Sequence, residues 1–192
     1  LGQTANFKTK CTIPAEKIAI ALNTFLPDDI AIIKSQEVSN DFHARYNAKE
    51  KTYKYRILNA PTRKPIEHNY SYHVRDKIDI EIMKYYAKLL LGTHDFKAFS
   101  STGSSIKTSI RTIHDISISQ LGDIIEIEFI GSGFLYNMVR IIAGTLVELG
   151  KKSTRYDIQK ALETGDRSYA GPTAPPQGLF LKKVSYILDN KA

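Results

Sequence analysis

Two segments with alternating polar and apolar residues constrain the fold more than any other feature of the sequence. "RTIHDISISQ" at 111–120 and "DIIEIEFIGS" at 123–132 surround a Leu-Gly-Asp turn at 121–123. The pattern predicts a β-hairpin, because side chains on a strand alternate between two faces and glycine suits a tight turn. The apolar segment 135–150 that follows predicts a helix. We therefore expect an α+β fold, with a largely antiparallel sheet and helices packed over it.

The remaining elements follow from the same periodicities. A helix is expected at 79–92, with Asp79 near its start and Gly92 at its end, and another at 13–27, where the apolar stripe stops at Pro27. Proline, asparagine and charge predict an exposed loop at 56–69. We also expect a helix at 154–166 and strands at 2–10, at 30–38, around Tyr53 and Tyr55, and at 178–188.

Composition and charge narrow the class of protein. The chain has 192 residues, 42% of them hydrophobic, which is enough to bury a core, and its formal charge of +7 favours a polyanionic partner such as nucleic acid. Cys11 is the single cysteine, so an intramolecular disulfide and a cysteine-based zinc cluster are excluded. No apolar run is long enough to cross a bilayer, and the first ten residues lack the layout of a signal peptide. We expect a cytoplasmic protein that does not associate with membranes.

The segment 40–57 combines cations with aromatic residues. Lys49, Lys51 and Lys54 could hold phosphate groups while Tyr53 stacks on an unpaired base, which together would make an RNA-binding surface. An edge strand explains the same residues differently, because lysines discourage edge pairing and alternating tyrosines suit a pleated surface. Both interpretations stay open on the sequence alone.

Arg140 is the most informative single residue. It lies in the apolar segment 135–150, where an arginine needs an anion or a water-lined cleft. The alternative is a guanidinium that reaches solvent from the first turns of the helix. Gly131, Ser132 and Gly133 permit a tight turn just before it, but they form no phosphate-binding motif on their own.

Other candidate groups favour structural interpretations. His94 and Asp95 could form an acid–base pair, but adjacent residues point in different directions, and a turn or cap explains them better. Asp28 and Asp29 are expected in a turn. No histidine spacing indicates a metal site, and no nucleotide-binding or hydrolase fingerprint occurs. We therefore expect no metal and no cofactor.

Five ordered motifs resemble those of the tRNA pseudouridine synthase A family, and the resemblance covers essentially the whole chain. It implies the pseudouridine synthase fold and isomerisation of uridine to pseudouridine in the tRNA anticodon stem-loop, at positions 38 to 40. It also implies that the protein needs no cofactor or metal and forms a homodimer. The motifs are "FHARYNAKEKTYKYRI", "LLGTHDFKAF", "RTIHDISI", "GSGFLYNMVRIIAGTLVELG" and "APPQGLFLKKVSY".

The resemblance also implies roles for individual residues. The tyrosine that matches Tyr53 stacks on the target uracil flipped into the cleft, and the arginine that matches Arg140 pairs with the catalytic aspartate. Leu181 matches an apolar residue packed close to the target base. The residues expected to line the cleft near the RNA are those of the Phe-His-Ala-Arg turn, namely Phe42, His43 and Arg45.

One departure from the family pattern affects the expected activity. The nucleophile belongs to a Gly-Arg-Thr-Asp-Ala-Gly-Val-His motif that is absent here. The resemblance therefore predicts an N-terminally truncated fragment, with 1–40 as the remainder of the N-terminal half and 41–192 as the C-terminal half, and without activity by itself. Two alternatives remain, a non-catalytic RNA-binding module and a protein-interaction domain whose apolar helices serve dimerisation.

Overall fold

The computed structural model describes residues 2–103 and 108–187 and divides into two compact units. The larger unit comprises Leu1–Gln3 and Lys49–Ser185, and the smaller unit comprises Thr4–Ala48 and Tyr186–Ala192. No helix in the described ranges is both long and apolar enough to cross a membrane.

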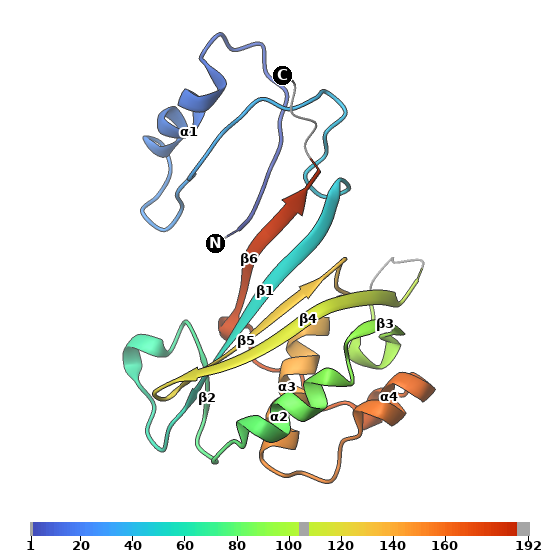
Figure 1. The fold of residues 1–192 in the computed structure, drawn as a ribbon. Coiled ribbons are helices and arrows are strands. Elements are labelled where there is room, and N and C mark those ends of the chain that lie inside the picture. Colours follow the sequence, from blue (N-terminus) through green and yellow to red (C-terminus); the bar gives the residue numbers. More distant parts are fainter. Residues whose placement is uncertain (1, 104–107, 188–192) are drawn as a thin grey trace. The chain divides into compact units, whose positions relative to one another are not determined.

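A mostly antiparallel sheet forms the larger unit (Figure 1). Its strand order is β2-β1-β5-β4-β3, and β6 also pairs with β1. The short β1–β2 pairing is parallel, whereas β1–β5, β5–β4 and β4–β3 are antiparallel. The predicted α+β class is thus confirmed. The strands are β1 (Ala48–Asn59), β2 (Tyr72–Val74), β3 (Gly92–Asp95), β4 (Ile110–Leu121), β5 (Ile124–Gly131) and β6 (Leu179–Tyr186).

The predicted hairpin is formed by β4 and β5. Its strands meet at Leu121 and Ile124, and Gly122 in the turn has a φ of +57°, a conformation that glycine adopts readily. Alternate residues of β5 point into the core, where Ile125, Ile127 and Phe129 are completely buried. The polar–apolar alternation of the sequence is therefore the alternation between the two faces of this sheet.

The α-helices of the larger unit gather on one side of this sheet (Figure 1). The helices are α2 (Ile80–Lys88), α3 (Met138–Gly150) and α4 (Ile158–Thr164). Asp79 caps α2 as predicted, because its carboxylate accepts hydrogen bonds from the backbone N–H groups of Glu81 and Ile82. Short 3-10 turns complete the unit at η1 (Pro65–Glu67), η2 (Lys97–Phe99), η3 (Arg167–Tyr169) and η4 (Pro176–Gly178).

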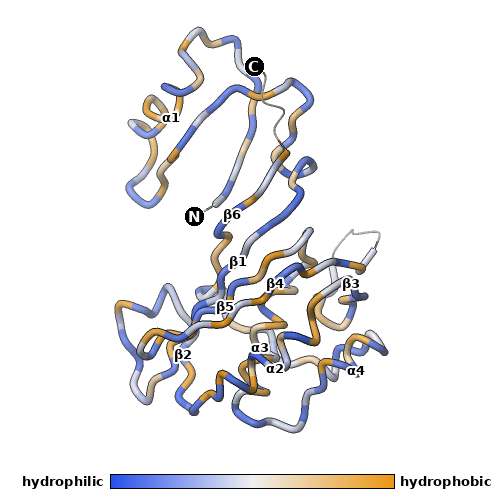
Figure 2. Tube along the Cα trace, in the orientation of Figure 1, coloured by the Kyte–Doolittle hydropathy of each residue, from blue (hydrophilic) through white to orange (hydrophobic). Residues whose placement is uncertain are grey.

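The core lies between the sheet and α3, in which 11 of the 13 residues are buried; Figure 2 colours each residue of the chain by its hydropathy. Helix α3 contributes Met138, Ile141, Ile142 and Leu146, all completely buried. An apolar helix of this kind is stable only when most of its surface is covered, which is what the sheet and its neighbouring helices provide.

The smaller unit differs from the expectation at several points. The prediction of strands at 2–10 and 30–38 is wrong, because neither segment is assigned as a strand. A segment with alternating polar and apolar residues becomes a strand only when its backbone is hydrogen-bonded to a neighbouring strand. The expected helix is shorter, α1 (Ala15–Asn23), and it ends before Phe25, whose side chain is 87% exposed. Asp28 and Asp29 lie in a turn, as predicted.

Two further corrections concern the larger unit. Strand β1 continues to Asn59, with Ile57 and Leu58 buried, so the exposed loop begins later than residue 56. Strands β2 and β3 were not expected, because each is too short to show a clear alternation.

Candidate active site

The two faces of β1 carry different parts of the basic aromatic segment. Residues on a strand alternate between faces, and the register of β1 with β5 runs without a shift from Lys51 to Leu58. Lys49, Lys51 and Tyr53 therefore share one face of β1, and Lys54 lies on the opposite face. The sequence grouped the three lysines together, but the strand separates one of them.

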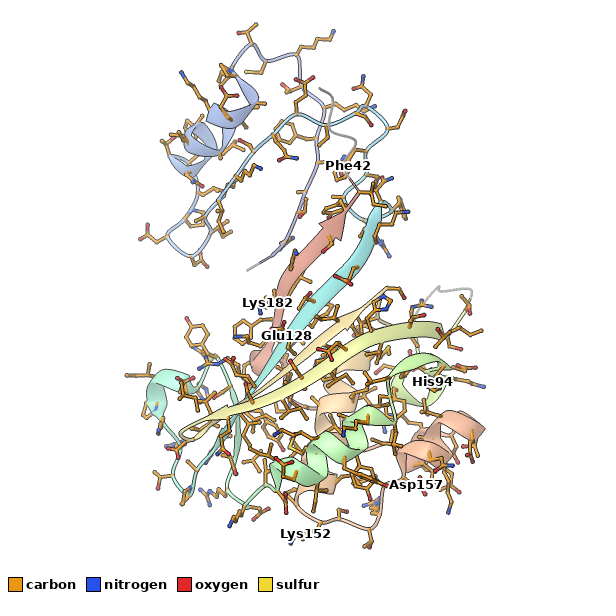
Figure 3. The ribbon with its side chains drawn as sticks, viewed as in Figure 1. Phe42, His94, Glu128, Lys152, Asp157 and Lys182 are labelled. Carbon is orange, nitrogen blue, oxygen red and sulfur yellow. The ribbon has the colours of Figure 1, made fainter. Side chains whose placement is uncertain are left out.

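Lys54 belongs to an ion-pair network on its face of the sheet. Its Nζ atom lies 2.8 Å from Oε2 of Glu126, and the other oxygen of that carboxylate lies 3.3 Å from Nε of Arg56. A second pair on β5 and β6 joins Glu128 to Lys182 (Figure 3). In the described ranges, by contrast, no carboxylate lies within ion-pair distance of Lys49 or Lys51.

Tyr53 is held as a half-buried aromatic platform. Its ring packs edge-on against Phe134, with the centroids 5.3 Å apart. Burial raises the pKa of the Tyr53 phenol, so the hydroxyl stays protonated at neutral pH. That hydroxyl makes no hydrogen bond to any described residue.

Arg140 is fixed at two points of its guanidinium. The Nε–H group donates to the Ala174 carbonyl oxygen at 2.7 Å, and Nη1 donates to Oδ1 of Asn137 at 3.0 Å. No carboxylate among the described residues lies within ion-pair distance of it. The side chain is partly buried, and two uncharged oxygen atoms hold its guanidinium in place. Because neither acceptor carries a charge, the positive charge of Arg140 is not neutralised and could pair with an anion.

Tyr55 is a site residue that the sequence interpretation missed. Its ring is completely buried, and its hydroxyl donates to the Pro175 carbonyl oxygen at 2.7 Å. Burial, with a contribution from Tyr72, raises the pKa of the Tyr55 hydroxyl, and the positive charge of Arg140 opposes that rise. The alternation of Tyr53 and Tyr55 could have placed both on one face, but nothing in the sequence identifies the loop that accepts the hydroxyl.

The loop between α4 and β6 is clamped onto α3. A Cβ atom on Gly144 would lie 1.9 Å from the Pro172 carbonyl oxygen, so only glycine allows this approach. Nearby, the Gly171 N–H group donates to Oγ1 of Thr145 at 2.8 Å. The consecutive carbonyls of Ala174 and Pro175 are thereby held in place, and they bind Arg140 and Tyr55 respectively.

Leu181 also belongs to the larger unit. It lies on β6, which pairs with β1, and its side chain is half-buried. Its carbonyl oxygen accepts a hydrogen bond from the Gly2 N–H group at 2.8 Å. The larger unit therefore contains Tyr53, Arg140 and Leu181. Within it, the loop that carries the Ala174 and Pro175 carbonyls connects Arg140 to Tyr55 on β1.

Phe42, His43 and Arg45 lie in the smaller unit and form a local turn there. The Phe42 ring packs edge-on against Tyr186, with the centroids 5.1 Å apart, and the Tyr186 hydroxyl donates to the Ala44 carbonyl oxygen (Figure 3). Nδ1 of His43 accepts a hydrogen bond from the Arg45 N–H group at 3.1 Å.

His94 and Asp95 do not form an acid–base pair. Nε2 of His94 lies 2.8 Å from the Leu91 carbonyl oxygen, whereas Oδ1 of Asp95 accepts from the Lys97 N–H group. The structural interpretation of these two residues is thus confirmed. Over the part of the chain that the structure describes, no three histidine, cysteine or acidic side chains are grouped so that they could hold a metal ion.

Comparison with known proteins gives a consistent result. The family model for tRNA pseudouridine synthase matches residues 86–187. The tRNA pseudouridine synthase A 2 of Clostridium tetani is 52% identical over 187 residues, which cover 97% of this chain and 75% of that protein. The tRNA pseudouridine synthase A of Acetivibrio thermocellus is 51% identical over 187 residues, covering 97% of this chain and 77% of the relative.

Proposed function

Because the chain belongs to the tRNA pseudouridine synthase A family, we propose that it serves the conversion of uridine to pseudouridine in tRNA. The proposed target is the anticodon stem-loop, at positions 38 to 40. The observation that carries the proposal is that one loop binds both β1 and Arg140. The loop does so through consecutive carbonyl groups, one of which accepts a hydrogen bond from Arg140 and the other from Tyr55. Tyr55 lies two residues from Tyr53, on the same face of β1.

In this proposal Tyr53 and Arg140 have different tasks. Tyr53 stacks on the uracil that has been flipped out of the RNA, an interaction worth about 1–3 kcal/mol per base. Arg140 pairs with the nucleophilic carboxylate and keeps its pKa low, so that the carboxylate is ionised when the uridine arrives. Leu181 packs near the target base, and Phe42, His43 and Arg45 contact the RNA.

The reaction conserves atoms and needs no cofactor or metal. The carboxylate attacks the flipped uridine, and the bond between the sugar and the base nitrogen breaks. The base then rotates and forms a bond from carbon 5 to the sugar, and the carboxylate leaves. The proton on carbon 5 is released to solvent, and the base nitrogen that left the sugar takes up a proton. Activity should accordingly need no added metal and should persist in EDTA.

The proposed nucleophile, the aspartate of the family motif, is not among the 192 residues. No Gly-Arg-Thr-Asp motif occurs in the sequence. We expect residues 1–192 alone to form no pseudouridine, since Arg140 offers no covalent chemistry. Joining a segment that carries such a motif before Leu1 should produce an active protein, called the motif-bearing protein below.

Tritium release from tRNA labelled at carbon 5 of uridine tests this proposal. The motif-bearing protein should release tritium, whereas residues 1–192 and a control with the motif aspartate changed to alanine should not. Release by residues 1–192 above a no-protein control would show that the nucleophile has been misidentified.

A second candidate function is a non-catalytic RNA-binding module. It is favoured by the shared face of Lys49, Lys51 and Tyr53, which combines cations with a stacking ring. This alternative predicts salt-dependent tRNA binding by residues 1–192 and no product from the motif-bearing protein. The proposed homodimer is a separate question, which sedimentation of the purified chain would answer.

A further inference from the structure

Asn137 has an unusual backbone conformation immediately before α3. Its φ is 59° and its ψ is 5°, in the left-handed region that few residues other than glycine occupy. It stands at the N-cap position, where an asparagine side chain normally accepts a hydrogen bond from a backbone N–H group of the first turn. Here the side chain makes no such bond.

The amide of Asn137 binds two side chains instead of capping the helix. Oδ1 accepts from Nη1 of Arg140 at 3.0 Å, and Nδ2 donates to Oγ of Ser101 at 3.1 Å. An arginine can only donate, so the oxygen of the amide must face the guanidinium. Ser101 is itself fixed, because its N–H group donates to the Tyr136 carbonyl oxygen at 3.1 Å.

We infer that Asn137 is a positioning residue that aims the guanidinium of Arg140 at its anionic partner. The inference rests on the proposed function. Asn137 holds Nη1 while the Ala174 carbonyl holds Nε, so rotation of the guanidinium is blocked at both ends. Nη2 has no acceptor among the described residues and remains available. Donors fixed before the anion arrives need no reorganisation during the reaction.

Two substitutions separate the amide from the backbone conformation. Asn137→Gly removes the amide but keeps the positive φ, which glycine adopts without strain, and no capping bond is lost. Asn137→Asp keeps an oxygen acceptor and also tolerates the left-handed region. Both variants should fold, so a change at Arg140 can be assigned to the side chain of residue 137.

The first test measures the guanidinium itself by ¹⁵N NMR of the arginine side chains in residues 1–192. The unsubstituted chain should show separate, slowly exchanging Nη signals for Arg140, identified by their loss in Arg140→Lys. In Asn137→Gly these signals should average, while Nε–H remains protected by Ala174, and Asn137→Asp should restore the separation. Arg167, whose Nη1 donates to the Ala170 carbonyl oxygen, should be unaffected throughout. Unchanged Arg140 signals in Asn137→Gly would overturn the inference.

The second test measures the reaction in the motif-bearing protein. Asn137→Gly should lower the single-turnover rate about tenfold, the scale of one hydrogen bond to a charged group, with little change in tRNA affinity. A loss confined to tRNA affinity, or an unchanged rate, would overturn the positioning role. Absence of product from the motif-bearing protein before any substitution would instead refute the proposed function, and the NMR comparison would still decide whether Asn137 fixes Arg140.

Discussion

The two units of the chain differ in how far their apolar side chains are buried. In the larger unit, Tyr55, Phe96 and Phe129 are completely buried between a sheet and its helices. In the described part of the smaller unit, Ala19 is the only buried residue, whereas Phe25 and Ile33 are 87% and 88% exposed. An amphipathic pattern therefore does not produce a core unless a second layer covers the apolar stripe.

The proposed site residues Arg140 and Tyr55 differ from His43 and Arg45 in how distant their hydrogen-bond partners are in the sequence. Arg140 is held by Ala174, 34 positions away in the sequence, and Tyr55 by Pro175, 120 positions away. In the smaller unit, Arg45 and His43 are joined by a bond between residues only two positions apart, although the neighbouring Phe42 packs against the distant Tyr186. The larger unit thus immobilises its functional groups through the tertiary fold, on which their geometry depends.

The largest expected effect comes from a matched pair of phenylalanine truncations. Phe129→Ala should destabilise the chain by about 3–5 kcal/mol, because it opens a cavity in a closed core. Phe25→Ala should change stability by less than about 0.5 kcal/mol, since its side chain is already in solvent. Denaturant unfolding followed by circular dichroism compares them, with Phe129→Leu as a milder truncation. Equal losses for Phe129→Ala and Phe25→Ala would remove the distinction between the units.

A smaller effect is expected from Tyr55→Phe. The substitution leaves the Pro175 carbonyl oxygen without its donor and should cost about 1–2 kcal/mol. Tyr53→Phe is the matched control, because that hydroxyl has no partner in the described part of the chain, and it should change stability by less than about 0.5 kcal/mol. Thermal unfolding of both variants at neutral pH would show whether the loop is held as described.

The Tyr55 hydroxyl also predicts a pH dependence. Burial raises its folded-state pKa above the ordinary value of 10.0, so the neutral form is favoured by folding. Its contribution to stability should be complete below pH 10.0 and should be lost as the pH rises above that value. Tyr55→Phe should flatten the alkaline decline in unfolding free energy. An equally steep decline in that variant would contradict a buried, neutral phenol.

The smallest expected effect concerns the lysines of β1. Lys51→Ala should lower tRNA affinity a few-fold and reduce the salt slope by about 1, as expected for a lost phosphate contact. Lys54→Ala should change affinity less, because Nζ of Lys54 is paired with Glu126 on the opposite face. Filter binding at several salt concentrations distinguishes the two. A larger loss for Lys54→Ala would place the RNA on the other face of the sheet.

The sequence predicted those elements whose signal is local. The hairpin of β4 and β5, the cap of α2 by Asp79 and the apolar helix α3 follow from periodicity and from one capping residue. The segments 2–10 and 30–38 have the composition of strands, but a strand exists only with a paired neighbour. Their incorrect assignment reflects this dependence on distant residues.

The candidate site was predictable only in part for the same reason. The sequence analysis singled out Arg140, as an arginine in an apolar helix, and Tyr53, as an aromatic residue beside three lysines. The partners of Arg140 were not predictable, because one is a backbone carbonyl and the other is the side chain of Asn137, which directly precedes α3. The separation of Lys54 from Lys51, by contrast, could have been predicted, because residues three positions apart on a regular strand lie on opposite faces.

The most direct test of the site is the single-turnover rate of Arg140→Met in the motif-bearing protein. Methionine keeps most of the apolar stem and removes the charge, so the nucleophilic carboxylate loses its partner and its pKa should rise. The predicted result is a fall in rate of about tenfold to a hundredfold, with tRNA affinity nearly unchanged. An intact rate with weakened tRNA binding, as expected for Lys51→Ala, would contradict the assignment of Arg140 to the active site.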